Sequence, residues 1–211
     1  MTQPTTSNPP VPLTRRRNGK TAAERQSERR QLLIDTTFEI IDNEGATAVT
    51  VRELSRRTGL TARYFYESFA GRDEMLRELF DAVADDMVDR CVAAIAAAKS
   101  DGGDIAEALA RSFIDGLIQD RSKARLFLYE PLVETALSGG VPARASRIAR
   151  IIHNELPDTL DRTERALVAL DLVGTLATVL SSWLTGAVRA TREQIIAHCV
   201  RRFHESGIGT V

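Results

Sequence analysis

The sequence predicts an all-α protein, and three observations support this fold class. Apolar residues recur at steps of three and four along most of the chain, which is the spacing of one helix face. Glycines and short polar runs separate these periodic segments, and no alternating strand pattern of useful length appears. The chain has 211 residues, which allows one or two domains, and its 43% of hydrophobic residues suffices for a sizeable core.

The first twenty residues differ from the rest in composition. Residues 1–14 are rich in Pro, Thr and Ser, and Arg15 to Lys20 add basic groups, so we expect residues 1–20 to form a disordered basic arm. The whole chain has a net charge of −1, whereas residues 1–30 hold seven basic groups and two acidic ones. A basic end on an acidic body fits a partner that presents phosphates there. The arm would either enter a minor groove or add non-specific attraction, and the sequence favours neither.

Residues 21–75 are expected to form a module that begins with a long helix. The pattern is helical from about Thr21 to Glu44, with Phe38 and Ile41 on its apolar stripe. Gly45 follows the last periodic residue, as a left-handed helix end requires.

Two short helices are expected to follow in the same module. Thr50 and Glu53 have the spacing of a capping box, which indicates a helix of about eight residues, and Gly59 ends it. Thr61 can cap a second short helix, from Ala62 to about Phe69. Two short helices joined by a tight glycine-containing turn, packed on a longer first helix, describe a helix-turn-helix.

Everything after this module also has a helical pattern, and we expect residues 76–211 to form a larger helical domain. Pro131 predicts a kink within its segment. The expected helices run from Asp73 or Glu74 to Lys99, and over Asp104–Gln119, Ser122–Leu137, Ala143–Leu156, Thr163–Val188 and Thr191–His204.

The segment from Thr50 to Leu76, TVRELSRRTGLTARYFYESFAGRDEML, resembles the TetR family of bacterial transcriptional regulators. The resemblance covers about fifty residues in detail, and in length and helical pattern it covers most of the chain. It implies a dimeric DNA-binding protein with a ligand pocket. The matching positions are Phe38, Ile41, Gly45, Thr50-Val51, Leu54, Gly59, Thr61, Phe65-Tyr66, Phe69 and Arg72.

The second short helix is expected to read the major groove. Phe65 and Phe69 are four residues apart and face inward, which turns the other side chains toward the open side or its margins. Arg63 could pair with guanine in a bidentate manner, while Ala62 and Tyr64 could meet thymine methyls. The expected DNA-binding residues are Thr50, Arg52, Thr61, Ala62, Arg63, Tyr64, Tyr66, Ser68 and Arg72.

Phosphate contacts rest partly on the resemblance. It implies that Tyr66 contacts a phosphate, and that Arg72, where the family usually has Lys, does likewise. Arg52 is a candidate for a base or a phosphate, and Thr50 for a phosphate through its hydroxyl or backbone N–H. Each arginine could instead solvate an exposed face, which is the interpretation that we favour for Arg56 and Arg57.

The last two long helices are the expected dimer interface. Thr163–Val188 is apolar on most of its circumference, which is too much for one intramolecular face, and Thr191–His204 adds further apolar residues. The resemblance implies a four-helix interface built from two copies, and the alternative is burial within one subunit. The candidate residues are Leu172, Leu176, Val179, Leu180, Leu184, Ile195, Cys199 and Phe203.

An effector pocket is implied by the same resemblance, among the helices from about residue 80 to 155. Few ionisable groups fall on the apolar faces there, which favours a hydrophobic or weakly polar ligand. Asp115 and Glu130 are possible polar handles, although surface positions are the simpler interpretation. The candidate lining residues, each of which could also be ordinary core, are Phe113, Leu117, Phe127, Tyr129, Leu132 and Trp183.

Enzymatic and metal-binding patterns are missing from the sequence. Cys91 and Cys199 make no disulfide framework, the three histidines lack metal-ligand spacing, and no phosphate loop or nucleophile elbow occurs. We therefore expect no enzyme activity, no metal and no cofactor. Polar residues interrupt the apolar run 166–188, so it is expected to be a buried helix rather than a membrane span, in a cytoplasmic protein.

These features predict a ligand-responsive transcriptional repressor that binds palindromic operator DNA as a homodimer and is released by a small, mostly apolar effector. The alternative is a DNA-binding assembly factor of the same fold, which recruits a protein partner without a small ligand. A cavity of roughly 300 Å³ or more would favour the first function.

Overall fold

The structure is a computed structural model that describes residues 21–138 and 141–209, with the side chains of residues 138 and 141–146 left out. Every regular element in these ranges is a helix, which confirms the predicted all-α fold. The basic arm expected over residues 1–20 lies outside the described residues.

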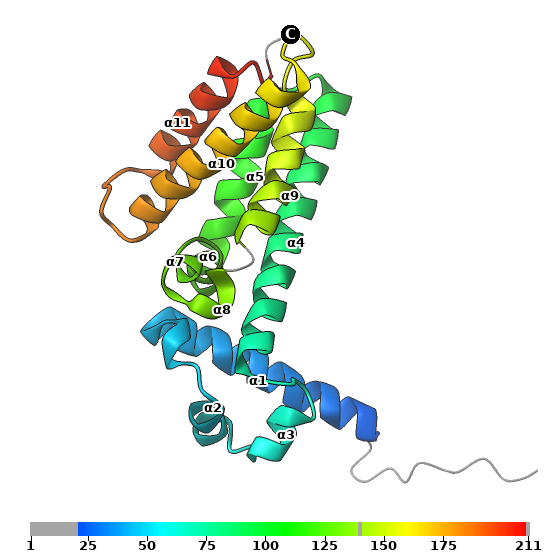
Figure 1. Cartoon of the computed structure of the whole chain (residues 1–211), viewed down its shortest axis with the longest axis vertical. Coiled ribbons are helices and arrows are strands. Elements are labelled where there is room, and N and C mark those ends of the chain that lie inside the picture. Colours follow the sequence, from blue (N-terminus) through cyan, green and yellow to red (C-terminus); the bar gives the residue numbers. More distant parts are fainter. Residues whose placement is uncertain (1–20, 139–140, 210–211) are drawn as a thin grey trace, which may run out of the picture.

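The N-terminal helices form one end of the elongated molecule (Figure 1). They are α1 (Ala22–Glu44), the single turn η1 (Ala46–Ala48), α2 (Val51–Thr58) and α3 (Ala62–Tyr66). Thr21 and Glu24 close a reciprocal capping box at the start of α1. Ile40, Leu54 and Phe65 are fully buried between these helices, so this end of the molecule has a core of its own side chains.

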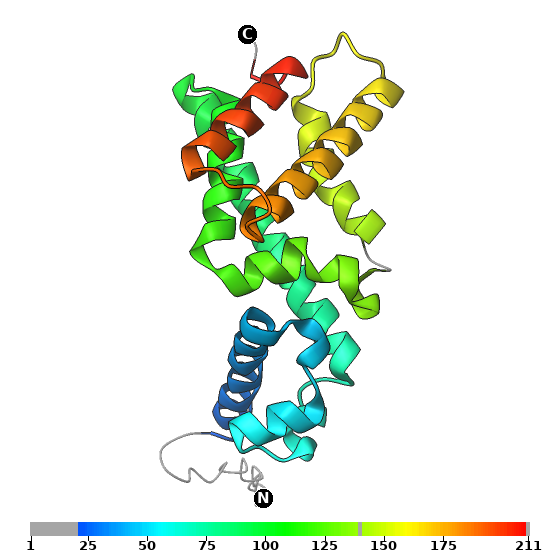
Figure 2. The same cartoon turned by 90° about the vertical axis from the view of Figure 1, so that its left-hand side faces the viewer.

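Helix α4 (Arg72–Asp101) leads from this end into a larger helical bundle. In the bundle, α4 packs on α5, α9 packs on α10 and α5 packs on α11. The turned view shows the C-terminus at the opposite end of the long axis from α2 and α3 (Figure 2). The bundle contains α5 (Ile105–Gln119), α6 (Arg121–Leu128), α7 (Glu130–Val133), α8 (Thr135–Ser138), α9 (Val141–Glu155), α10 (Arg162–Leu184) and α11 (Arg192–Glu205).

The expected helix Ser122–Leu137 is three short helices, α6, α7 and α8. Pro131 lies in the first turn of α7, where its missing N–H is tolerated. In a continuous helix the same proline would leave the carbonyl of Phe127 without its donor and would clash with it. The sequence predicted the interruption at this proline, but a kinked single helix was wrong.

Two predicted helix ends differ in detail. Gly45 has φ +91° and ψ 166°, so its backbone is extended on the positive-φ side rather than left-handed helical. Helix α3 ends at Tyr66 instead of Phe69, although the N–H of Phe69 still donates to the carbonyl of Phe65 at 2.9 Å. Thr61 precedes α3 but makes no side-chain cap.

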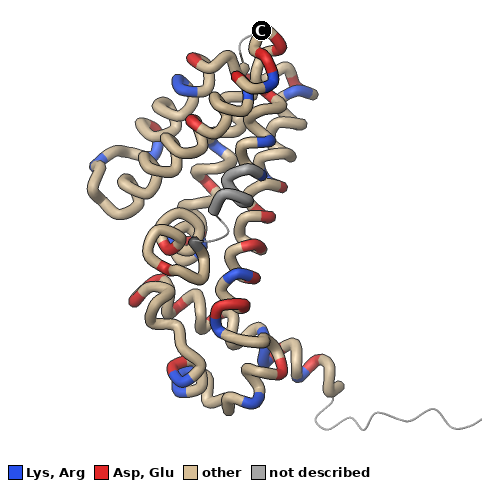
Figure 3. Tube along the Cα trace, in the orientation of Figure 1, with Lys and Arg blue, Asp and Glu red and all other residues tan. Residues whose placement is uncertain are grey.

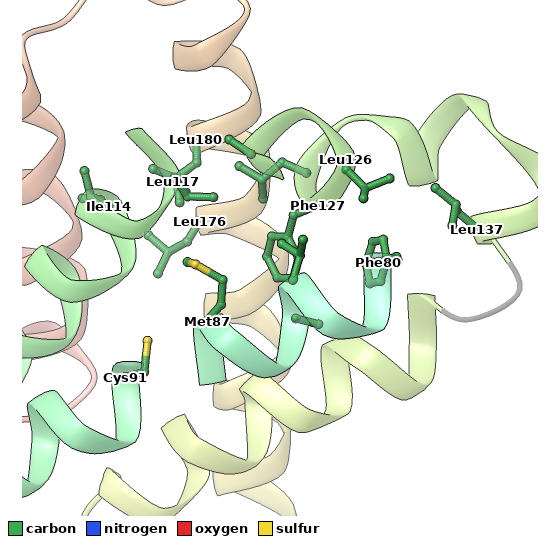
Figure 4. Packing of buried hydrophobic residues seen from close by; sticks show 14 of the residues in the cluster. Phe80, Met87, Cys91, Ile114, Leu117, Leu126, Phe127, Leu137, Leu176 and Leu180 are labelled. Carbon is green, nitrogen blue, oxygen red and sulfur yellow. The ribbon is translucent and has the colours of Figure 1, made fainter. Parts of the chain in front are cut away.

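One contiguous hydrophobic core runs from the N-terminal helices into the bundle. Phe127 of α6 stacks on Phe80 of α4, with ring centroids 5.6 Å apart, and its edge meets Phe113 of α5. Figure 4 shows the rings of Phe80 and Phe127 beside each other, and the side chain of Met87 extending toward Leu176. Such close packing transmits a change in shape from one helix to the next.

Helix α10 is long and apolar enough, by length and composition alone, to cross a membrane. Its residues Leu172, Leu176 and Leu180 are buried in the core of the bundle, between α10 and its neighbours. This packing makes α10 a helix of the bundle core rather than a membrane span.

Candidate nucleic-acid interface and internal cavity

The turn between α2 and α3 has the geometry that a helix-turn-helix needs. Gly59 ends α2 in the left-handed conformation, with φ +70° and ψ 5°. The hydroxyl of Thr50 caps the start of α2 by accepting from the N–H of Glu53 at 3.1 Å. The reciprocal half of the predicted capping box does not form, because the Glu53 carboxylate accepts from Arg56 and Arg57 instead. These two hydrogen bonds lower the pKa of Glu53 to about 2.

Helix α3 turns one face inward and another to solvent. Phe65 and Phe69 are buried, as the sequence predicted. The side chain of Arg63 is 84% exposed and Tyr66 is 60% exposed, and Thr61 and Ala62 are exposed beside them. The outer face of α3 is therefore open to a groove of DNA, and the contacts expected of these residues stay predictions.

Tyr64 and Ser68 lie at the margin of this face and are half-buried. The guanidinium of Arg29, in α1, stands 4.4 Å from the centre of the Tyr64 ring, a cation–π contact. The hydroxyl of Ser68 donates to the carbonyl of Tyr64 at 3.2 Å. In this geometry Tyr64 packs against α1 and Ser68 bonds to the preceding turn of its own segment, and the DNA contacts expected of both residues stay predictions.

Carboxylates hold several of the arginines near the open face, and Figure 3 shows acidic and basic positions close together along these helices. Glu67 pairs with Arg63 at 3.0 Å and with Arg29 at 3.7 Å. Glu53 holds Arg56, which is exposed, and Arg57, which is half-buried and also pairs with Glu44, so only Arg56 lies on an exposed face. These four arginines are therefore paired, and DNA phosphates would compete with the carboxylates for them.

Arg72 is directed into the junction between the two parts of the molecule. Its Nε donates to the carbonyl of Val49 and its Nη2 to the carbonyl of Ala46, both at 2.8 Å. The guanidinium also pairs with Glu134 and with Asp73. The hydrogen bond with Glu134 raises the pKa of Arg72 and lowers that of Glu134. This geometry does not support the phosphate contact expected of Arg72.

A cavity of about 150 Å³ lies inside the bundle, among α4, α5, α6, α7, α9, α10 and α11. Its walls are apolar side chains, and no lining residue carries a charge at neutral pH. Both cysteines line it, and burial raises the pKa of Cys91 to about 12 and that of Cys199 to about 11, so both are neutral thiols. The cavity is half the volume of the roughly 300 Å³ expected for an effector pocket.

The structure corrects most of the predicted pocket lining. Phe113 and Phe127 line the cavity, while Leu117 is buried in the core beside it. Tyr129 and Leu132 are exposed, because the break between α6 and α8 turns them outward. The ring N–H of Trp183 donates to the carbonyl of Ala190 at 2.9 Å, away from the cavity. Asp115 lies near the surface, where it pairs with Arg192, and Glu130 is buried in the junction.

The expected dimer residues are also placed differently. Within one subunit, the core of the bundle already buries Leu172, Leu176, Leu180, Ile195, Cys199 and Phe203. Leu176, Leu180, Cys199 and Phe203 are in fact part of the cavity wall. Val179 and Leu184 are half-buried. Helix α10 has apolar residues on both its inner and its outer face. The residues that the sequence pattern indicated for the dimer interface lie on the inner face.

The outer face of α10 carries an exposed stripe. Leu167 is 63% exposed and Leu170 is 49% exposed, and Gly174 and Thr178 continue the stripe at helical spacing. We call these four residues the α10 stripe.

Together, α1, α2 and α3 form a helix-turn-helix DNA-binding module that is carried on a helical bundle. Residues 33–79 match the family model described as "Bacterial regulatory proteins, tetR family". The match identifies residues 33–79 as a DNA-binding domain of the TetR type. A search of curated proteins found no match to the sequence.

Solved structures share the fold. A TetR-family regulator from Syntrophomonas wolfei superposes with a TM-score of 0.70 at 12% identity, covering 88% of this chain and 97% of the other. The fatty acid degradation regulator FadR from Bacillus halodurans gives 0.67 at 16%, covering 83% and 94%. The multidrug binding protein EbrR, in complex with imidazole, gives 0.59 at 22%, covering 82% and 94%. At these identities the likeness establishes the fold alone.

Proposed function

We propose that the protein is a ligand-responsive repressor, which binds palindromic operator DNA in the cytoplasm as a homodimer and is released by a small, uncharged, apolar effector. The observation that carries this proposal is the combination of an open face on α3 and an apolar cavity inside the bundle. Module 21–75 would bind DNA, and the helices of 76–211 would bind the effector and the second subunit. The basic arm, residues 1–20, would add phosphate contacts.

Readout is proposed to centre on Arg63. Its side chain stands out from α3, and arginine pairs in a bidentate manner with the O6 and N7 atoms of guanine. Ala62 and Tyr66 flank it on the same open face, and Arg52 is exposed at the start of α2. Thr50, whose hydroxyl caps α2, would contact a phosphate through its backbone. Arg72 and Tyr64 are instead assigned to support the module.

The effector is proposed to be an uncharged apolar molecule. An ionised ligand would lose its hydration in a cavity that offers no opposite charge, which costs several kcal/mol or more. An apolar cavity of about 150 Å³ accepts a molecule of the size of benzene. The structural relatives include a fatty acid degradation regulator, a gamma-butyrolactone receptor and a multidrug binding protein, so the fold serves ligands of varied chemistry.

Dimerisation is proposed to bury the α10 stripe. A second copy would cover Leu167 and Leu170, and Gly174 would let the two α10 helices approach closely. A two-fold dimer of this kind places two α3 helices on one face of DNA, which a palindromic operator requires.

One set of measurements tests the proposal. Duplexes are selected from random DNA by the full-length protein, and their symmetry and half-site spacing are determined. Native mass spectrometry of the purified protein reports both the dimer and any small molecule that copurifies. A two-fold symmetric consensus and an uncharged bound molecule are expected. A monomer that selects one unrepeated site would contradict the proposal.

A DNA-binding assembly factor without a small ligand is the second candidate. The observation that favours it is the volume of the cavity, which is below the roughly 300 to 1,000 Å³ of drug-sized sites. The same mass spectra separate the two candidates, because an assembly factor would carry no small molecule and would retain a protein partner.

A further inference from the structure

The segment from Arg125 to Glu134, which spans the end of α6 and all of α7, has two functional faces. On one face, Phe127, Leu128 and Pro131 line the cavity. On the other, the carboxylates of Glu130 and Glu134 meet the turn between α1 and α2. Figure 1 shows α6, α7 and α8 between α1 and the upper part of the bundle. The cavity and the DNA-binding module are therefore separated by the thickness of one short segment.

Glu130 accepts a hydrogen bond from a main-chain N–H of the DNA-binding module. Only 1% of its surface is exposed, and its Oε2 accepts from the N–H of Ala46 at 3.0 Å. Its Oε1 accepts from the Nε of Arg125 at 2.7 Å, and Arg125 in turn donates to the carbonyl of Asp42 at 3.1 Å. Gly45 permits this approach, because a Cβ there would stand 2.8 Å from the Nη2 of Arg125.

Glu134 is connected to the same turn through an ion pair with Arg72. The Arg72 guanidinium donates to the carbonyls of Ala46 and Val49, which flank the turn that precedes α2, and pairs with buried Glu134. Glu130 and Glu134 thus both hold residues 45–49, which come immediately before α2 and α3. We call α2 and α3 the reading helices. We call Glu130, Glu134, Arg125 and Arg72 the junction.

Buried charge-assisted hydrogen bonds do not stretch gradually. They are strong at 2.7–2.9 Å, and a charge that loses its partner in a dry site is heavily penalised. A ligand that displaces Phe127 or Pro131 must either carry the 45–49 turn with it or break the junction. Either result changes the direction in which α2 and α3 point.

We infer that Glu130 and Glu134 are positioning residues, which set the orientation of the reading helices and report the filling of the cavity to them. The inference rests on the proposed function for its effector. It assigns Arg72 to regulation of the reading helices, in place of a contact with DNA.

The test uses the full chain, the selected duplex and benzene as the probe. Variants Glu130→Gln and Glu134→Gln keep the shape of each side chain and remove its charge. Glu107→Gln is the matched control, because Glu107 pairs with Arg111 on the surface of α5, away from the junction. Hydrogen exchange of the Ala46 amide reads the junction directly, since that N–H donates to Glu130.

Without benzene, Glu130→Gln is expected to speed exchange at Ala46 by about tenfold, and both junction variants are expected to weaken binding of the duplex several-fold with unchanged circular dichroism. Benzene at saturation is expected to weaken binding by the wild-type protein and by the Glu107→Gln control by about 5- to 150-fold. In both junction variants this loss is expected to be below about twofold. Where a glutamine variant does not fold, Arg72→Lys carries the same comparison.

Junction variants that bind the duplex, exchange Ala46 and respond to benzene like wild type would overturn the inference. Failure of benzene to bind the wild-type cavity has a different meaning, since it would contradict the proposed effector. The measurements without benzene then still decide whether the junction positions the reading helices.

Discussion

At the scale of single residues, the sequence predicts which side chains of α3 are exposed. It does not predict which residues form ion pairs. The two phenylalanines four residues apart predicted which side of α3 is buried, and Arg63 and Tyr66 are exposed accordingly. The inward turn of Arg72 toward Glu134 could not be predicted, because the two residues are 62 positions apart and both belong to surface-typical residue types. Local spacing defines a face, whereas ion-pair partners are set by the tertiary fold.

Replacing Arg63 tests readout. Arg63→Ala is expected to weaken binding to the selected duplex by about 1–3 kcal/mol and to relax base preference at one position, because a bidentate guanine contact is lost. Competition assays against single-base variants of the duplex measure both effects. Arg56→Ala is the control, since Arg56 is held by Glu53 and is expected to alter all duplexes slightly and equally. Equal losses for both variants would place the reading face elsewhere.

Replacing Arg72 tests its structural role. Arg72→Met leaves Glu134 buried without its cation, and we expect a loss of about 3 kcal/mol in the free energy of unfolding at pH 7, measured in urea. A phosphate contact alone would leave stability unchanged and would weaken binding to every duplex.

The acid dependence of stability gives a second reading of the same pair. Arg72 lowers the pKa of Glu134 below its ordinary 4.5 in the folded state. A depressed pKa contributes stability that is present above pH 4.5 and is lost as the pH falls through the lower folded value. The difference in unfolding free energy between wild type and Arg72→Met is therefore expected to shrink on acidification. A difference independent of pH would contradict the ion pair.

At the scale of elements, periodicity placed most helices to within a few residues. It failed at α6, α7 and α8, where Pro131 ends one helix and starts another, and where Glu130 and Glu134 bond to the turn before α2. It also missed the conformation of Gly45, which is extended at positive φ and leaves no room for a Cβ beside Arg125. The structure of such segments depends on contacts with distant elements, which a local sequence pattern does not show.

The two glycines of the module offer a matched comparison. Gly45→Ala places a Cβ against the Arg125 guanidinium at positive φ, and Gly59→Ala has positive φ with nothing within 4 Å. We expect Gly59→Ala to cost about 1–2 kcal/mol of stability from backbone strain, and Gly45→Ala to cost at least about 1 kcal/mol more. Thermal and urea unfolding of the two variants measure this. Equal losses of stability in the two variants would show that the Arg125 side chain moves aside at no cost, and that the junction is not rigid.

At the scale of the whole molecule, the sequence predicted the class of protein and misjudged the use of its apolar surface. Helix α10 is apolar around most of its circumference, so hydrophobicity alone cannot say which side faces the core. The cavity explains part of the error, because Leu176, Leu180, Cys199 and Phe203 face it from α10 and α11. Packing against α9, α11 and α6 decides which face of α10 remains for a second subunit.

Aspartates on the outer face of α10 test whether the α10 stripe is the subunit interface. The double variant Leu167→Asp/Leu170→Asp puts carboxylates on the α10 stripe, where a subunit interface would have to bury them unpaired at a cost of several kcal/mol. We expect a folded monomer with unchanged helical circular dichroism. We also expect at least about a hundredfold loss of operator affinity, because the two α3 helices are no longer held one duplex turn, about 34–36 Å, apart.

Two controls define this outcome. Leu176→Asp buries a charge inside one subunit and is expected to unfold the protein, whereas Val92→Asp changes an exposed apolar residue of α4 and is expected to leave a normal dimer. Sedimentation equilibrium and binding to the selected duplex measure all three. If the double variant remains dimeric while Leu176→Asp unfolds, the α10 stripe is not the subunit interface. The dimer would then have to use another surface, and the spacing of its reading helices would differ from one duplex turn.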